Sequence, residues 1–72
     1  MGELKETVAR SLRVQRAKAG MTQDELARVS GVSVDAIRSY ERCMSLPLLE
    51  TAYKLAKALG CSVNDLCGFS AS

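Results

Sequence analysis

Residues 22–42 have the sequence TQDELARVSGVSVDAIRSYER, and this stretch decides the fold. Thr22 and Glu25 have the T-x-x-E spacing of a capping box, so a helix is expected to begin at Thr22. That helix can continue for only about two turns, because Gly31 favours a left-handed stop. Ser33 is a suitable N-cap for a second helix. The stretch therefore predicts two short helices joined by a three-residue turn.

The same stretch shows which sides of these two helices face inward. Apolar and small residues recur at helical spacing, and Val32 can pack under the turn. The residues expected on the inner faces are Leu26, Ala27 and Ser30 in the first helix, and Ile37 and Tyr40, with Glu41 close by, in the second. A short glycine-containing turn between two such helices indicates a helix-turn-helix motif at about residues 22–42.

Helical patterns also flank the motif. Upstream, an apolar stripe predicts a helix over residues 4–19, closed by Gly20; the stripe consists of Leu4, Val8 and Leu12, with Arg16 next on the same line. Downstream, Pro47 can open a fourth helix that ends at Gly60. Its expected apolar face consists of Leu49, Ala52, Leu55, Ala56 and Leu59.

A short fifth helix is expected to begin at Ser62, which forms a capping pair with Asp65, and to bury Val63 and Leu66. Residues 68–72 are expected to be a frayed tail. The alternation of polar and β-branched residues that marks strands is absent. We therefore predict an all-α fold of five short helices, forming one domain over residues 1–72.

Composition narrows the classes of function. The chain has 72 residues, of which 47% are apolar, and a net charge of only +2, so charge alone does not indicate nucleic acid. Residues 1–42 carry eight Lys/Arg and six Asp/Glu, whereas residues 43–72 carry two of each. A basic surface would therefore have to arise from the placement of these side chains.

The cysteines and the lack of histidine argue against metal and disulfide sites. Cys43, Cys61 and Cys67 form no C-x-x-C pair, and no histidine is present to complete a zinc site. An odd number of widely spaced cysteines favours reduced thiols and a cytoplasmic protein. We find no secretory signal and no apolar run long enough for a membrane span, and we expect no cofactor.

The order of motifs resembles a known family. The stretch LRVQRAKAGMTQDELARVSGVSVDAIRSYER, followed by P, LAKALG and SVNDL, resembles the lambda-repressor-like (Xre-type) helix-turn-helix domains of bacterial and phage regulators. The resemblance covers residues 8–66. It implies a five-helix domain that dimerises on a near-palindromic operator of double-stranded DNA, with the third helix in the major groove.

The resemblance also implies roles for individual residues. It implies that Gln23, at the positive end of the second helix, supports a phosphate contact, and that Arg16 and Glu41 form a partly buried ion pair. Arg38 and Ser39 lie between the inward positions of the third helix and are the leading candidates for contacts with base edges. The remaining candidate DNA contacts are Ser33, Val34, Asp35 and Arg42.

The front of the third helix departs from the family pattern. Val34 and Asp35 occupy positions where the family often has glutamine, serine or threonine. Val34 can touch a thymine methyl group, and Asp35 can accept a hydrogen bond from a cytosine amino group. Alternatively, Asp35 stabilises the helix by complementing the positive end of its dipole. Arg38 can likewise be a solvated arginine without a base contact.

The loop after the motif is a second departure. Cys43 stands where the family commonly has glycine, so the helix is expected to end differently here. Met44 and Leu46 replace cations, and exposed apolar residues suggest a protein contact. The candidate dimer contacts are Met44, Leu46, Leu66 and Phe69, although the two loop residues can instead fold back onto the core.

The sequence therefore predicts a sequence-specific DNA-binding transcriptional regulator that forms a homodimer. The alternative is a protein-interaction module, such as an antitoxin or an adaptor, whose helix-turn-helix has drifted. A redox switch through Cys43 is a more remote third interpretation. An enzyme is not expected, because the sequence lacks histidine, a paired-carboxylate pocket and a phosphate-binding loop.

Overall fold

Five α-helices follow one another in the computed structural model, which describes residues 3–68. Their bounds are α1 Glu3–Ala19, α2 Gln23–Ser30, α3 Val34–Glu41, α4 Leu49–Leu59 and α5 Val63–Cys67. The described part of the chain contains no strand, so the predicted all-α fold of five helices is confirmed. The tail expected to fray lies mostly outside the described residues.

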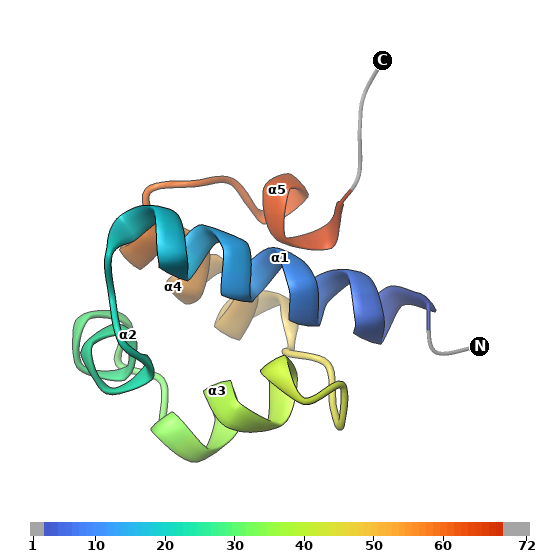
Figure 1. The fold of residues 1–72 in the computed structure, drawn as a ribbon, viewed down its shortest axis with the longest axis horizontal. Helices are drawn as coiled ribbons and strands as arrows, with labels where there is room; N and C mark the ends of the chain where they lie inside the picture. The colour runs from blue at the N-terminus through green and yellow to red at the C-terminus, as the bar shows by residue number, and fades with distance from the viewer. Residues whose placement is uncertain (1–2, 69–72) are drawn as a thin grey trace.

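The long α1 lies at the centre of the arrangement. In Figure 1 it crosses the middle of the molecule, with α5 on one side, α3 on the other and α4 behind it. α1 contacts α3, α4 and α5, whereas α2 packs against α3 and α4. The helix-turn-helix of α2 and α3 is therefore supported from two sides, by α1 and by α4.

The predicted capping boxes define the starts of α2 and α5. The Thr22 hydroxyl accepts a hydrogen bond from the Glu25 N–H at 3.1 Å, and the Glu25 carboxylate accepts one from the Thr22 N–H at 2.8 Å. The backbone hydrogen bond from Thr22 lowers the pKa of Glu25. Ser62 and Asp65 form the same reciprocal pair at α5. Both starts were predicted from local spacing and are confirmed.

The turn between α2 and α3 depends on a left-handed residue. Gly31 has φ 77°, a value that L side chains rarely adopt, and a Cβ added there would meet no atom within 4 Å. The requirement for glycine at this position is therefore conformational rather than steric. Ser33 then caps α3, and its hydroxyl accepts a hydrogen bond from the Ala36 N–H at 3.2 Å.

One apolar core joins all five helices. It contains at least one predicted inward residue from each helix, together with Val32 of the turn, namely Leu12, Leu26, Val32, Ile37, Leu55, Ala56 and Leu66. Met21, before the cap of α2, and Tyr40 of α3 are half-buried against this core. Each fully buried leucine or isoleucine contributes about 1.5–3 kcal/mol. The small domain therefore gains most of its stability from this shared cluster.

Two leucines predicted to be in the core are exposed. Leu49 is 76% exposed and Leu4 is 50% exposed. Val8, Ala52 and Leu66 are buried beneath them, and the two leucines line, with these residues, an apolar hollow of about 200 Å³ that is open to the surface. The predicted inner faces of α1 and α4 are therefore wrong at their first turns.

The start of α4 also differs from the prediction. Pro47 does not open the helix, because Leu48 is the N-cap and Leu49 is the first helical residue. The Leu48 side chain makes no capping hydrogen bond. Pro47 instead precedes the cap and lines the same hollow as Leu49.

The end of α3 is also unlike the expectation. Cys43 adopts φ 63° and is the one non-glycine residue with positive φ among residues 3–68. Its N–H donates to the Tyr40 carbonyl at 3.2 Å, and the Met44 N–H donates to the Ser39 carbonyl at 2.9 Å. These two bonds form the same left-handed helix end that glycine makes. The expectation of a different helix end is therefore wrong, and the backbone bonds offset the strain at Cys43.

Replacing Cys43 by glycine is expected to stabilise the protein. Glycine would remove the strain that the left-handed conformation imposes on an L residue. Part of this gain is lost, because glycine also has greater conformational freedom in the unfolded chain. We expect the free energy of unfolding to rise by about 0.5–1 kcal/mol, measured by urea denaturation. Cys43→Ala is the control, because it removes the thiol and keeps the strain. Equal stabilisation by both substitutions would show that strain is not the cause.

Candidate nucleic-acid interface

The Glu41 carboxylate joins the first three helices. It accepts hydrogen bonds from Arg16 Nε at 2.9 Å, from Arg16 Nη2 at 3.1 Å and from Gln23 Nε2 at 3.1 Å. Glu41 is buried, and no buried side-chain polar atom in the described structure lacks a partner. Because the three residues lie on α1, α2 and α3, this Glu41 node sets the angle at which α3 is presented.

Arg16 is held at several points. Its Nη1 also donates to the Met21 carbonyl at 3.0 Å, in the link between α1 and α2. The hydrogen bonds to Glu41 raise the pKa of the Arg16 guanidinium, which therefore stays charged. The structure thus brings together the two residues for which the family resemblance implied an ion pair, and adds Gln23 to them.

Sequence reasoning missed one member of this region. Arg13 Nη1 donates to the backbone carbonyl of Glu41 at 2.6 Å, in the last turn of α3. A cation at this end of a helix satisfies a free carbonyl and complements the helix dipole. The available signal was the spacing of Arg13 and Arg16, which places both on neighbouring turns of one face of α1.

The front of α3 carries a second, exposed ion pair. Arg38 Nη1 lies 3.5 Å from Asp35 Oδ1, and the two side chains are 46% and 91% exposed. A pair this accessible contributes little to stability, and water screens it. The pair places a carboxylate beside the arginine that was predicted to contact bases.

The other predicted contact residues lie along or beside α3. Val34 is half-buried and Ser33 and Arg42 are exposed, one at each end of the helix. The hydroxyl of Ser39 lies 2.7 Å from that of Ser45, so this side chain ties α3 to the following loop. Sequence reasoning did not identify Ser45, because two serines six residues apart give no recognisable pattern.

The predicted dimer contacts do not form one set. Met44 and Leu46 are exposed, but Leu66 is only 2% exposed and belongs to the core, so its prediction as a contact is wrong. Leu66 is buried because α5 packs against both α1 and α4. Phe69 lies outside the described residues.

Residues 3–68 contain no metal-binding cluster, no disulfide and no membrane-spanning helix. No group of three or more histidine, cysteine or carboxylate side chains in this range is arranged to hold a metal ion. All three cysteines are free, and burial raises the pKa of Cys61. No helix in the same range is long and apolar enough to cross a membrane.

Removing the cation from the Glu41 node is expected to destabilise the fold. Arg16→Met would leave a buried carboxylate with Gln23 as its remaining side-chain donor, which we expect to lower the free energy of unfolding by about 2–3 kcal/mol. The double variant Arg16→Met/Glu41→Leu removes the carboxylate as well, so its free energy of unfolding should fall by clearly less. Urea denaturation measures both variants. Equal losses in the two would show that the unpaired carboxylate is not the cause.

Comparison with known proteins agrees with this geometry. A family model described as helix-turn-helix matches residues 12–66. The cryptic phage CTXphi transcriptional repressor RstR of Vibrio cholerae serotype O1 is 37% identical over 54 residues, which are 75% of this chain and 48% of the repressor. An uncharacterized HTH-type transcriptional regulator of Archaeoglobus fulgidus is 42% identical over 55 residues, which are 76% of this chain and 79% of that protein.

Solved structures show the same arrangement of helices. An HTH_3 family transcriptional regulator from Vibrio cholerae superposes with a TM-score of 0.85 and 29% identity, covering 90% of this chain and 36% of its own. A hypothetical transcription factor, NHTF from Neisseria, superposes with a TM-score of 0.84 and is 31% identical. The match covers 89% of this chain and 74% of the Neisseria chain. The chain thus spans about half or less of the two Vibrio proteins. Since the family model matches well over half of this chain, the chain belongs to the helix-turn-helix family of lambda-repressor-like (Xre-type) domains.

Proposed function

We propose that this chain is a sequence-specific DNA-binding transcriptional regulator that acts as a homodimer on a near-palindromic operator. The observation that carries the proposal is the Glu41 node, which fixes α2 and α3 so that the exposed Arg38 face of α3 points away from the core. The names of the relatives, a transcriptional repressor and a transcriptional regulator, support the same function.

In the proposed complex, α3 lies in the major groove and the ends of the helices contact the DNA backbone. Gln23 is the first residue of α2, and its Nε2 carries one N–H beyond the one given to Glu41. That donor and the free backbone N–H groups of α2 suit a phosphate. Ser33 and Arg42, at the two ends of α3, are placed to add phosphate contacts on either side of the base contacts.

Arg38 is the residue proposed to contact a base. The ion pair with Asp35 involves one Nη, so the guanidinium retains donors for a bidentate contact with guanine O6 and N7. The same pair lowers the electrostatic cost of bringing Asp35 close to phosphates. Val34 is the apolar side chain proposed to contact a thymine methyl group. Ser39 is less free to contact DNA, because its hydroxyl is bonded to Ser45.

The homodimer is proposed to form through a leucine rim, defined as Leu4, Leu46 and Leu49 around the apolar hollow on α1, α4 and the preceding loop. All three side chains are exposed, and the neighbouring Met44 and Leu48 are exposed as well. A contiguous apolar surface of this kind marks a protein contact. A homodimer that binds both half-sites of one operator would need its two α3 helices about 34 Å apart. Occupying the operator would then block or recruit RNA polymerase.

Substituting Arg38 tests the proposed base contact. In a selection of bound sequences from random DNA, we expect the wild-type chain to enrich a near-palindrome, and Arg38→Ala to lose the preference at one position in each half-site. Loss of a bidentate guanine contact should weaken binding to the best site by about 1–3 kcal/mol. Binding is measured by electrophoretic mobility at several salt concentrations, because phosphate contacts make it salt-dependent.

Arg10→Ala is the matched control, since it removes the same charge from the exposed surface of α1. This variant should weaken binding to all DNA sequences by the same factor and leave the selected sequence unchanged. If Arg38→Ala behaved in the same way as this control, Arg38 would be a phosphate contact and not a base contact. If the wild-type chain enriched no sequence at low salt, the proposed function would be wrong.

Substituting Leu49 tests the dimer. Because Leu49 is largely exposed, Leu49→Lys should leave the fold intact and place two like charges at the proposed interface. We expect sedimentation velocity to show a monomer, and operator affinity to fall by at least about tenfold, since the half-sites then bind separately. Val14→Lys adds the same charge at another exposed position of α1 and should remain dimeric. An unchanged dimer in Leu49→Lys would place the interface elsewhere.

A further inference from the structure

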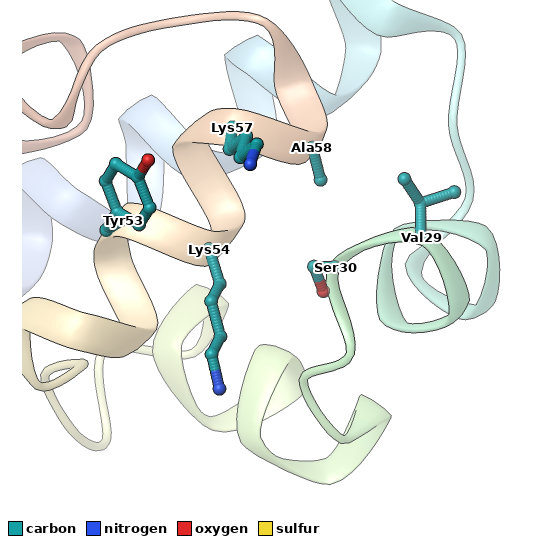
Figure 2. Close-up of a pocket in the computed structure, with 6 residues that line it drawn as sticks. All are labelled: Val29, Ser30, Tyr53, Lys54, Lys57 and Ala58. Carbon is teal, nitrogen blue, oxygen red and sulfur yellow. The ribbon is translucent and has the colours of Figure 1, made fainter.

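A second hollow lies between α2 and α4, apart from the leucine rim. It has a volume of about 470 Å³ and is lined by Val29, Ser30, Tyr53, Lys54, Lys57 and Ala58. Figure 2 shows that the C-terminal end of α2 supplies one wall and α4 supplies the other, with Val29 and Ala58 facing each other across the gap. None of these residues takes part in the Glu41 node or lies on α3. We call this feature the α2–α4 hollow.

Three of the six residues that line the α2–α4 hollow are apolar or aromatic, namely Val29, Tyr53 and Ala58. Val29 is 55% exposed and Tyr53 is 58% exposed, and the half-buried Ala58 also lines the hollow. Tyrosine offers a large apolar ring with a polar tip and is enriched in the buried centres of protein interfaces. An apolar side chain from another molecule could therefore bury surface here that is now in water.

The edge of the hollow is positively charged. Lys54 and Lys57 are exposed and lie three residues apart on α4, so they occupy neighbouring turns of one face. No carboxylate lines the hollow, and neither lysine forms an ion pair within residues 3–68, although Glu50 lies one turn before Lys54. The hollow thus combines apolar side chains in its walls with two available cations.

We propose that the α2–α4 hollow docks an acidic segment of a partner protein. A large apolar side chain of the segment would pack against Val29, Ala58 and Tyr53, and its carboxylates would face the two lysines. The apolar walls favour a protein over a nucleic acid, because phosphates would pair with the lysines and leave the walls unused. Exposed ion pairs contribute little affinity, so the apolar anchor supplies most of the binding and the lysines select the charge of the partner.

The proposal is tested with a library of displayed random peptides of about a dozen residues, selected on the wild-type chain. The expected peptides carry aspartate or glutamate beside leucine or an aromatic residue. The selected peptide is then titrated into the ¹⁵N-labelled chain. We expect its largest amide shifts at the six lining residues, and its affinity, measured by fluorescence anisotropy, to fall at least about tenfold in Val29→Ser/Lys54→Gln/Lys57→Gln.

The matched control is Val14→Ser/Lys5→Gln/Lys18→Gln, which makes the same three changes at exposed positions of α1. It should bind the peptide as the wild type does, and circular dichroism checks that both triple variants remain folded. The proposal is overturned if no acidic–apolar peptide is enriched, or if both triple variants bind alike. It is also overturned if a short random-sequence DNA duplex displaces the peptide, or if dilution of the chain alone shifts the same amides, which would indicate a nucleic acid or a second copy.

Discussion

The arrangement of α2 and α3 depends on a single buried carboxylate. Glu41 is the only charged residue fully inside the described structure, and its oxygens are bonded by Arg16 of α1 and Gln23 of α2. Apolar packing alone specifies the angle between short helices less narrowly, because a core of the right volume and pattern tolerates more than one packing. Three directional bonds to one carboxylate fix that angle more narrowly, since each bond requires its own geometry. The node thereby converts a small apolar core into a rigid support for α3.

Gln23 has two roles in this arrangement, one in the node and one in the proposed contact with DNA. The amide is placed at the start of α2, where a phosphate would be favoured, yet it is also bonded to Glu41. One amide can serve both partners because it carries two N–H groups. Contact with DNA at this point would therefore act directly on the residue that joins α2 to α3. Helix packing and the proposed phosphate contact share a single side chain.

Sequence reasoning predicted best what local chemistry controls. The two capping boxes, the cap at Ser33 and the left-handed Gly31 were all found from spacing within four residues. It failed where the surroundings of a residue decide the outcome. Leu49 has the right spacing for the core, but it lines an apolar hollow at the surface and is 76% exposed. The spacing of Arg13 and Arg16 places both on one face of α1, but the contact of Arg13 with the last turn of α3 also depends on how the two helices cross.

Cys43 shows a different limit of sequence reasoning. Its residue type argues against a left-handed helix end, yet the structure has one, because two backbone hydrogen bonds outweigh a local preference. The chain then leaves α3 in a direction that exposes Met44 and Leu46 and brings Ser45 to Ser39. Cys43 therefore lies between the proposed DNA-contacting surface of α3 and the loop that contributes to the proposed dimer surface. It ends the helix that carries Arg38, and it sets the course of the loop that contributes to the leucine rim.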